Sequence, residues 1–522
     1  MDMHNVVDDV VVVGKSDVAP ADVIAVARGN ARIELSADAL AEMAGSRARI
    51  DALAAEPRPV YGVSTGFGAL AVRHIERPLR AQLQRSLVRS HAAGMGPQVE
   101  REVTRALMFL RLKTLASGRT GVRPVVAETM AAILNADITP VVREYGSLGC
   151  SGDLAPLSHC ALTLMGEGLA YGADGEVRPA GELLTEAGIT PIELAEKEGL
   201  ALINGTDGML GMLVMAIADL GRLFTTADIT AAMSLEALLG TEKVLQPELH
   251  AIRPHPGQAA SAANMLKVLE GSGLTGHHQD DAPRVQDAYS IRCAPQVAGA
   301  GRDTLSHAML VADRELAAAV DNPVVLPDGR VESNGNFHGA PVAYVLDFLA
   351  IAAADLGSIA ERRTDRLLDK SRSHGLPAFL ADDPGLDSGL MIAQYTQAAL
   401  VSENKRLAVP ASVDSIPSSA MQEDHVSMGW SAARKLRQAV DNLARILAVE
   451  LTASARALEI RLNAGNGPLA PATAAALAGA RAAGVVGPGT DRFLAPDLEA
   501  AEAFVAGGGL VAAVESVTGA LV

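Results

Sequence analysis

The feature that most constrains the fold is a long stripe of apolar residues in the last third of the chain. Its members follow one another at steps of four and three residues: Leu436, Val440, Leu443, Leu447, Leu451, Ser454 and Leu458. This is the spacing of one helix face, and at about 1.5 Å per residue such a helix is roughly 33 Å long. Residues 345–359 repeat the pattern, and residues 209–223 are apolar on nearly every side, as in a helix buried among other helices. The pattern predicts a mainly α-helical protein containing an elongated multi-helix bundle.

Composition supports helices and divides the chain. Only 8 Phe, 6 Tyr and 1 Trp occur among 522 residues, so the core must consist of Ala, Leu, Val, Ile and Met, which suit close-packed helices better than sheets. From about residue 20 to residue 200, short apolar segments alternate with Gly and Pro, which indicates mixed helix and loop. We therefore expect a smaller mixed domain over residues 1–204 and a helical bundle over residues 205–522.

Charge and cysteine content restrict the partners and the compartment. The chain has 44 Lys and Arg against 61 Asp and Glu, a net charge of −17, which argues against a nucleic-acid partner. Its cysteines are Cys150, Cys160 and Cys293, an odd number that fits neither a disulfide framework nor a zinc pattern. We find no signal peptide, and the longest strongly apolar run, 208–218, is too short to span a bilayer. We expect a soluble cytoplasmic protein with no membrane partner.

Two motifs that suggest a nucleotide or a metal do not hold on inspection. The GKS sequence at 14–16 lacks the glycine that a phosphate-binding loop needs five positions earlier, where Asp9 stands. The HHQDD sequence at 277–281 contains ligand-type side chains, but adjacent residues point in divergent directions, so a solvated loop is the better interpretation. We therefore expect no bound metal.

One segment carries unusual chemistry, the GSLGCSGDLAPLSH sequence at 146–159. It could simply begin a helix, with Ser151 or Asp153 as N-cap. However, Gly152 has no Cβ, so its amide nitrogen can approach the carbonyl carbon of Cys150 at low steric cost. Ring closure there, followed by loss of the Ser151 hydroxyl as water, gives a five-membered ring with an exocyclic methylidene carbon. That carbon is an electrophile that no ordinary side chain supplies.

This segment resembles the signature of the aromatic amino acid ammonia-lyases, whose Ala-Ser-Gly condenses into a methylidene-imidazolone (MIO) group. Here Cys150 replaces the alanine, and we expect the ring to form from Cys150, Ser151 and Gly152 nevertheless. The resemblance extends over nearly the whole chain through five further motifs: YGVSTGFG at 61–68, GLALINGT at 199–206, QDAYSIRC at 286–293, GNFHG at 335–339 and QEDHVSM at 422–428. Within this family the chain is most similar to the histidine-specific branch of actinobacteria.

The resemblance implies a carbon–nitrogen lyase that eliminates ammonia from L-histidine and leaves trans-urocanate, in histidine degradation. It also implies the helical architecture shared with fumarase and aspartase, a homotetramer, and an MIO ring near several helix N-termini, whose positive ends would raise its electrophilicity. A true fumarase- or aspartase-type lyase would need a Met-Pro-x-Lys sequence, which is absent here. A non-catalytic helical scaffold would leave the crowded polar motifs unexplained.

Roles for individual residues follow from the same resemblance. Tyr61 would be the base that removes the β-proton, and Arg292 would bind the substrate carboxylate. The alternative for Tyr61 is a hydroxyl that holds a loop in place, and the alternative for Arg292 is a buried ion pair. A free tyrosine has a pKa of about 10, so we expect activity shifted to alkaline pH.

Three more residues match positions around the MIO group and the amino-acid portion of the substrate: Asn204, Gln286 and Tyr289, the last of them a catalytic candidate. Hydrogen bonding within packed loops is the alternative for these. Phe337 would form a wall of the site, or be ordinary core.

Substrate choice depends on two positions. His91, after Ser90, can exchange a hydrogen bond with an imidazole, and Glu423 can accept the other ring N–H. Together they would form a polar clamp that rejects a phenyl ring. His91 alone would also fit a tyrosine-selective enzyme, so a tyrosine or phenylalanine ammonia-lyase, or an aromatic 2,3-aminomutase, is the alternative function. Asp207 stands where many histidine-specific relatives have Gln, and the sequence gives that departure no meaning.

Overall fold

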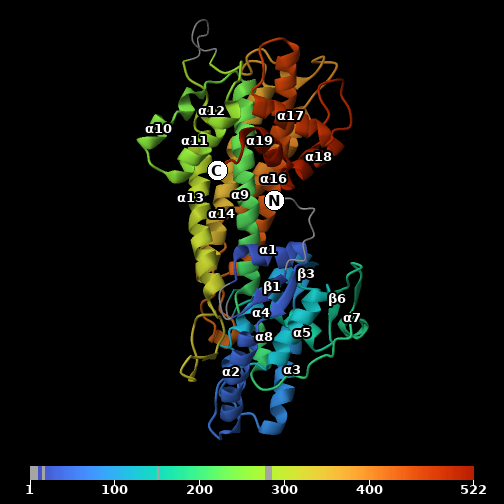
Figure 1. Ribbon diagram of the computed structural model, residues 1–522, viewed down its shortest axis with the longest axis vertical. Coiled ribbons are helices and arrows are strands. Elements are labelled where there is room, and N and C mark those ends of the chain that lie inside the picture. Colours follow the sequence, from blue (N-terminus) through green and yellow to red (C-terminus); the bar gives the residue numbers. More distant parts are fainter. Residues whose placement is uncertain (1–9, 15–17, 150–151, 277–284) are drawn as a thin grey trace. The chain divides into compact units, whose positions relative to one another are not determined.

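The computed structural model describes residues 10–14, 18–149, 152–276 and 285–522, and most of them lie in α-helices (Figure 1). The chain divides into two compact units. Unit 1 comprises Met1–Met215, Met309–Leu346 and Pro410–Arg434, and unit 2 comprises Ala216–Ala308, Asp347–Val409 and Lys435–Val522. The predicted mainly α-helical fold is confirmed. The domain boundary predicted between residues 204 and 205 stays a prediction.

The strands of the described residues are short, and all belong to unit 1. They are β1 (Val10–Val13), β2 (Arg32–Leu35), β3 (Met95–Gln98), β4 (Thr139–Pro140), β5 (Arg143–Tyr145), β6 (Leu169–Tyr171), β7 (Val177–Pro179), β8 (Val324–Val325) and β9 (Val331–Glu332). β1 and β2 pair in parallel, with Val10 opposite Arg32. The pairs β3–β5 and β8–β9 and the three-stranded sheet β4–β6–β7 are antiparallel.

Unit 1 contains a long helix, α4, that is buried from Val103 to Ala116. The helices of this unit are α1 (Pro20–Gly29), α2 (Ala37–Ala55), α3 (Arg80–His91), α4 (Arg101–Ala116), α5 (Pro124–Asn135), α6 (Leu154–Leu164), α7 (Ala180–Glu186), α8 (Glu198–Ile203) and the 3-10 helices η1 (Gly68–Leu70), η2 (Arg77–Leu79) and η6 (Ser419–Met421). α4 packs against α1 and α5. Its buried cations bond backbone carbonyls: Arg105 that of Val26 at 3.1 Å and Lys113 that of Ala318 at 2.5 Å. Buried charges are tolerated when they are paired in this way.

Unit 2 is helical throughout its described residues. It contains α10 (Pro247–Ala251), α11 (Pro256–Leu269), α12 (Tyr289–Arg292), α15 (Met391–Leu407), α17 (Pro471–Ala482), α18 (Ala495–Ala506), α19 (Gly509–Thr518), η3 (Glu242–Leu245) and η5 (Ala378–Leu380). α10, α11 and α17 begin with proline, whose fixed φ suits the first helical position. Four helices contribute residues to both units: α9 (Asp207–Ala237), α13 (Ala294–Ala317), α14 (Ala340–Leu368) and α16 (Gly429–Asn463).

The three apolar segments found in the sequence lie in three of these long helices, α9, α14 and α16. Every member of the 436–458 stripe belongs to α16 and is buried, and the all-round apolar segment forms the first half of α9. By length and composition alone, α9 and α14 could cross a bilayer, but 72% and 61% of their most apolar windows are buried inside the protein. The hydrophobic faces of these helices are thus largely covered by other parts of this chain.

A buried carboxylate joins three of the long helices within unit 2. Glu450 of α16 accepts hydrogen bonds from Thr230 Oγ1 at 2.8 Å and Ser234 Oγ at 2.9 Å, both on α9. Arg363 of α14 forms an ion pair with the same carboxylate, and both partners are almost completely buried. A buried charge stripped of its partner costs several kcal/mol.

Replacing Glu450 by Gln should therefore lower the free energy of unfolding by about 3 kcal/mol, because it leaves the Arg363 charge buried without its counter-ion. Urea denaturation followed by circular dichroism measures the change. Glu332→Gln is the matched control, since it breaks an ion pair with Arg330 whose side chains are 51% and 64% exposed; it should change stability by under about 0.5 kcal/mol. Equal losses in the two variants would contradict this assignment.

Candidate active site

Two adjoining cavities in unit 1 bring together five of the predicted site residues. One, of about 610 Å³, is lined by Tyr61, His91, Asn204 and Glu423. The other, of about 570 Å³, shares Tyr61 and Glu423 and adds Phe337. Apolar side chains line much of the remaining wall of the first cavity: Leu83, Leu87, Leu154, Leu200 and Ile203. A concave, partly apolar surface with a few convergent polar groups is typical of a small-molecule site.

Tyr61 lies in a turn that is closed by the side chain of Ser64, whose Oγ accepts a hydrogen bond from the Val60 amide at 2.9 Å. Burial of the phenol raises the pKa of Tyr61 above its ordinary value of 10.0. A hydrogen bond with the Gly68 backbone lowers this pKa, and the negative charges of Glu423 and Asp321 raise it further. The Tyr61 phenol is therefore protonated near neutral pH when no substrate is bound.

His91 is the last residue of α3, and its ring is neutral. Burial lowers the pKa of His91 below 6.5, more than the Leu87 carbonyl and the Glu423 charge raise it. Ser90 Oγ donates to the Leu87 carbonyl at 3.0 Å and lies 3.1 Å from His91 Nδ1. Because the single Ser90 proton is already used, the network assigns the ring proton to Nδ1. Nε2 is then a hydrogen-bond acceptor.

Glu423 is held by a tight loop. Its Oε2 accepts a hydrogen bond from Ser418 Oγ at 2.8 Å, and the two residues form an antiparallel bridge. Between them Ser419, Ala420 and Met421 have φ values of 50°, 51° and 68°, a left-handed conformation that costs non-glycine residues energy. The loop therefore fixes the position of a carboxylate at the expense of local backbone strain.

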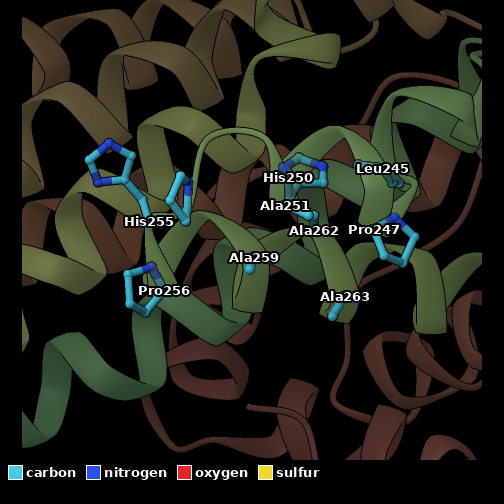
Figure 2. A pocket seen from close by; sticks show the side chains of 10 residues that line it. Leu245, Pro247, His250, Ala251, His255, Pro256, Ala259, Ala262 and Ala263 are labelled. Atoms are coloured by element: carbon cyan, nitrogen blue, oxygen red, sulfur yellow. The ribbon is translucent and has the colours of Figure 1, made fainter.

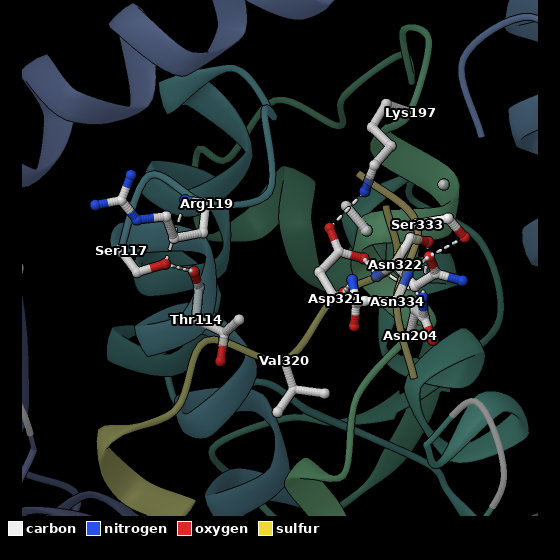
Figure 3. A network of polar contacts seen from close by, with 12 residues as sticks. Thr114, Ser117, Arg119, Lys197, Asn204, Val320, Asp321, Asn322, Ser333 and Asn334 are labelled. Atoms are coloured by element: carbon white, nitrogen blue, oxygen red, sulfur yellow. Dashed lines mark hydrogen bonds and ion pairs between the residues drawn. The ribbon is translucent and has the colours of Figure 1, made fainter. Parts of the chain in front are cut away.

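Asn204 belongs to a polar network that holds the cavity wall (Figure 3). Its Nδ2 donates to the Asn322 carbonyl at 2.9 Å and lies 3.5 Å from Asp321 Oδ1. Asp321 forms a fully buried ion pair with Lys197. The Asn204 Oδ1 atom is buried and has no hydrogen-bond partner among the described residues, which makes it the free acceptor of this network.

The loop that flanks the predicted MIO tripeptide is packed tightly against another backbone segment. Cys150 and Ser151 lie outside the described residues. Gly152 has a φ of 76°, and a Cβ placed on it would overlap the backbone of Gly205. The amide of Asp153 donates to the Gly205 carbonyl at 2.6 Å. Only glycine fits at position 152 in this arrangement.

The residues on either side of the tripeptide contact the N-terminal ends of three helices besides α6, which begins directly after Asp153. The Gly149 carbonyl accepts from Ser427 Oγ at 2.8 Å and from the Gly339 amide at 3.3 Å, just before α16 and α14. The Met428 amide donates to the Leu148 carbonyl at 2.9 Å. The third is α9, whose first amides bind the Asp153 carboxylate. Helix N-termini carry a partial positive charge, and the effect of this charge on an MIO ring stays a prediction.

Asp153 differs from its sequence-based interpretation. It precedes α6 but makes no side-chain cap there; instead its Oδ2 accepts from the Gly208 and Met209 amides of α9 at 2.9 and 3.0 Å. Its Oδ1 accepts from Ser147 Oγ at 2.9 Å. Burial raises the pKa of Asp153 to about 7, with the Asp207 charge adding to the rise and the hydrogen bonds opposing it. Asp153 thus caps a different helix from the one expected.

Three predicted residues lie in unit 2. Arg292 ends α12, donates from Nε to the Asp287 carbonyl at 3.0 Å, and stacks its guanidinium 4.6 Å from the Tyr289 ring centroid. Tyr289 is 71% exposed, and Gln286 is exposed as well. None of the three is among the residues that line the two unit-1 cavities, and their roles stay predictions.

Sequence analysis missed Lys197, Asp321 and Asn322. Lys197 and Asp321 are 124 positions apart, so no local spacing indicates that they pair. The only available signals were weak ones, a lysine just before a buried apolar segment and an Asp-Asn-Pro turn.

Another cavity, of about 450 Å³ in unit 2, contains none of the predicted residues (Figure 2). Its lining is mostly alanine and proline, with His250 and His255. The His250 ring is engaged within the protein, by Gln258 Nε2 at 2.9 Å and by the Val244 carbonyl at 3.2 Å. Within the described ranges, no group of three or more His, Cys, Asp or Glu side chains is arranged to hold a metal ion, and the HHQDD sequence at 277–281 lies outside those ranges.

Similarity to known proteins assigns the family. The sequence profile named aromatic amino acid lyase matches residues 18–482. The chain belongs to this family. It is similar to the histidine ammonia-lyases of Streptomyces avermitilis, at 80% identity over 98% of this chain and 99% of that protein, and of Streptomyces coelicolor, at 78% over the same shares.

Solved structures of family members share the fold. A tyrosine aminomutase from Streptomyces globisporus superimposes with a TM-score of 0.91 at 40% identity, covering 98% of this chain and 99% of that one. A histidine ammonia-lyase from Trypanosoma cruzi gives a TM-score of 0.88 at 38% identity, covering 97% and 95%. The family's helical architecture therefore extends over the whole chain, and the resemblance read from five motifs is confirmed.

Replacing Glu423 by Gln should lower the pKa of Tyr61, because it removes one of the two negative charges that raise it. Alkaline titration of phenolate absorbance measures this, with the titration of Tyr61→Phe subtracted to isolate one tyrosine. In the unaltered chain the Tyr61 transition should lie above that of free tyrosine, and in the variant it should move to lower pH.

Asp424→Asn serves as the control for this titration. It removes a charge from the neighbouring position in the same cavity wall, but Asp424 is not among the groups that shift the Tyr61 pKa. An equal displacement in both variants, or none in Glu423→Gln, would show that Glu423 does not act on Tyr61.

Proposed function

We propose that this chain is a histidine ammonia-lyase, which eliminates ammonia from L-histidine to give trans-urocanate. The observation that carries the proposal is the high identity to Streptomyces histidine ammonia-lyases over nearly the full length of both chains. The cavity geometry supports it, since His91 and Glu423 line the same cavity as Tyr61 and Asn204. The small-molecule substrate fits a cavity of about 610 Å³.

The proposed prosthetic group is MIO, formed from Cys150, Ser151 and Gly152 without an external cofactor. It would supply an electrophilic carbon that activates the substrate nitrogen as a leaving group. The described residues fit such a group: Gly152 is packed where no side chain fits, and Asn204 Oδ1 is a buried acceptor without a described partner. The helix N-termini around the flanking loop would favour negative charge there.

Tyr61 is proposed to remove the β-proton of the substrate through its phenolate oxygen. Since the pKa of Tyr61 is raised in the free chain, only a small fraction is ionised near neutral pH. Turnover should therefore increase with pH until the phenol is ionised. This agrees with the alkaline activity expected from the sequence.

His91 and Glu423 are proposed to hold the substrate imidazole from its two nitrogens. With the ring proton of His91 assigned to Nδ1, its Nε2 would accept one ring N–H, and the Glu423 carboxylate would accept the other. A substrate imidazole bound in this way is doubly protonated and so can stabilise negative charge that develops at its β-carbon. A phenyl ring offers neither acceptor an N–H donor, so each substrate hydrogen bond lost in this largely apolar cavity would cost about 1–3 kcal/mol.

The remaining residues keep the roles that the family resemblance implies. Arg292 would bind the substrate carboxylate, and Asn204, Gln286 and Tyr289 would surround the MIO group and the amino-acid portion. Phe337 would form a wall of the site.

We further propose a cytoplasmic homotetramer. Exposed apolar side chains on α14 and α15 are compatible with an assembly, since Phe348, Ile351, Ile392 and Tyr395 are 45–63% exposed.

The competing function is that of a tyrosine or phenylalanine ammonia-lyase, or of an aromatic 2,3-aminomutase, because tyrosine aminomutase structures are also similar to this chain. Incubation with L-histidine, L-tyrosine and L-phenylalanine separates these functions. We expect urocanate from histidine. A cinnamate or a β-amino acid as the main product, without urocanate, would overturn the proposal.

Replacing Ser151 by Ala should reduce the rate of urocanate formation by several orders of magnitude, because alanine has no hydroxyl to lose and the methylidene carbon cannot form. Absorbance of urocanate measures turnover, and circular dichroism should show an unaltered helix content. The intact mass of the unaltered chain should be lower than the sequence mass by two waters. Normal turnover in the variant would rule out this electrophile.

Replacing Glu423 by Leu should reduce kcat/KM for L-histidine about 10- to 100-fold, the loss of one hydrogen bond to a charged group. Thermal unfolding should change little, because the carboxylate serves the cavity rather than the core. Ser418→Ala is the matched control: it removes the hydroxyl that binds this carboxylate but keeps the charge, so its effect should be smaller. An undiminished preference for histidine in Glu423→Leu would remove Glu423 from substrate recognition.

A further inference from the structure

A buried ion pair lies directly behind the glycine that faces the tripeptide loop. Arg111 of α4 is fully buried, and Asp207, the first residue of α9, is 5% exposed. Arg111 Nε and Asp207 Oδ2 are 3.4 Å apart. Neither atom makes a hydrogen bond with another described residue, so each charge is the principal partner of the other.

The other nitrogens of Arg111 hold the backbone of the active-site network. Nη1 donates to the carbonyls of Ala201 at 3.2 Å and Asn204 at 2.9 Å, and Nη2 donates to the Val320 carbonyl at 2.8 Å. One planar guanidinium thus fixes the end of α8 to the segment that leads into Asp321 and Asn322. The position of Asn204 therefore depends on where Arg111 lies.

The ion pair packs against Gly205, and Gly205 packs against Gly152 of the tripeptide. A Cβ on Gly205 would overlap the Asp207 carboxylate and lie 2.7 Å from Arg111 Nη2. A Cβ on Gly152 would in turn overlap the Gly205 backbone. The pair, Gly205 and Gly152 are therefore in direct contact in that order, with no space for a side chain between them. A shift of the guanidinium would be transmitted to Gly152.

There is little room for solvent to take over from the Asp207 carboxylate. The space beside Asp207, bounded by Lys113, Thr206 and Glu315, is about 10 Å³, which is at the lower limit for a single water. Thr206 Oγ1 already donates to Glu315 Oε1 at 3.1 Å. Without Asp207, Arg111 would keep its three carbonyl acceptors but lose its counter-ion, and because a buried charge without its counter-ion is unfavourable, we expect the guanidinium to shift.

The position of Gly152 matters most before the MIO ring exists. Ring closure joins the Gly152 nitrogen to the Cys150 carbonyl carbon and releases one water, and loss of the Ser151 hydroxyl with its α-hydrogen releases the second. Such an intramolecular step depends steeply on how the two reacting atoms are held.

We propose that the Arg111–Asp207 ion pair is a positioning pair for maturation of the tripeptide, which holds Gly205 against Gly152 so that ring closure is fast. The pair touches neither the substrate nor the reacting atoms. The inference rests on the proposed function only in requiring that the tripeptide cyclises; it does not depend on which amino acid the enzyme uses.

The test follows maturation directly, by the intact mass of freshly translated chain stopped in acid at successive times. Asp207→Asn keeps the size of the side chain and removes its charge. We expect it to lose the two waters about 10- to 100-fold more slowly than the unaltered chain, in line with the cost of a misplacement of about 1 Å. Maturation of Asp207→Asn at the unaltered rate would overturn the proposal.

The matched control is Asp228→Asn. Asp228 is also a buried aspartate paired with an arginine, Arg302, at 2.6 Å, but it lies in unit 2. Its variant should lose stability and still mature at the normal rate. Equally slow maturation in this variant would show that general destabilisation explains the effect, and would overturn the positioning role.

A double variant, Arg111→Gln with Asp207→Asn, separates positioning from the cost of an unpaired charge. It removes both charges, so it should fold more stably than Asp207→Asn alone. Without the guanidinium that binds the Asn204 and Val320 carbonyls, we expect its maturation to stay slow. Recovery of the normal rate in the double variant would contradict the proposal.

The same measurement distinguishes this inference from the proposed function. If the unaltered chain never loses two waters, the proposed MIO group fails. If it loses them and yields no urocanate, the proposed substrate fails while the positioning pair can still be judged from the masses alone.

Discussion

The architecture of unit 1 depends on one buried carboxylate, that of Asp153. A carboxylate without solvent must be satisfied by donors, and here the donors are two amides at the start of α9 and the Ser147 hydroxyl. Because Asp153 directly follows the tripeptide, this requirement ties the tripeptide to the first turn of a long helix. The close contact of Gly152 with Gly205 and the bonds around Gly149 complete a rigid setting for the loop.

The cavity beside this loop is electrostatically negative on its own. Glu423 and Asp321 both raise the pKa of Tyr61, and Glu423 opposes the fall in the pKa of His91. Arginine side chains do not line the first cavity. Such a setting suits a substrate ring that brings its own N–H donors. It also favours the protonated form of the Tyr61 phenol.

Much of the helical architecture could be predicted from the sequence, because helical periodicity is a local property. The 436–458 stripe lies in α16, and its buried face follows from the spacing alone. Glu423 could be named because it lies in a family motif, and His91 because the family resemblance marks its position. The Lys197–Asp321 and Arg111–Asp207 pairs could not, since their members lie far apart along the chain and nothing local signals a buried partner. The prediction that Asp153 caps the helix directly after it was wrong for the same reason, because its side chain caps α9 through a tertiary contact.

Unit 1 is assembled from three separate stretches of chain, and the last of them begins at Pro410. The hydrogen bonds that Ser427 and Met428 make to the loop cannot form until those residues have left the ribosome. At about 5–20 residues per second, synthesis of 428 residues takes roughly 20–90 s. During biosynthesis, therefore, the surroundings of Leu148 and Gly149 can be completed only near the end of translation.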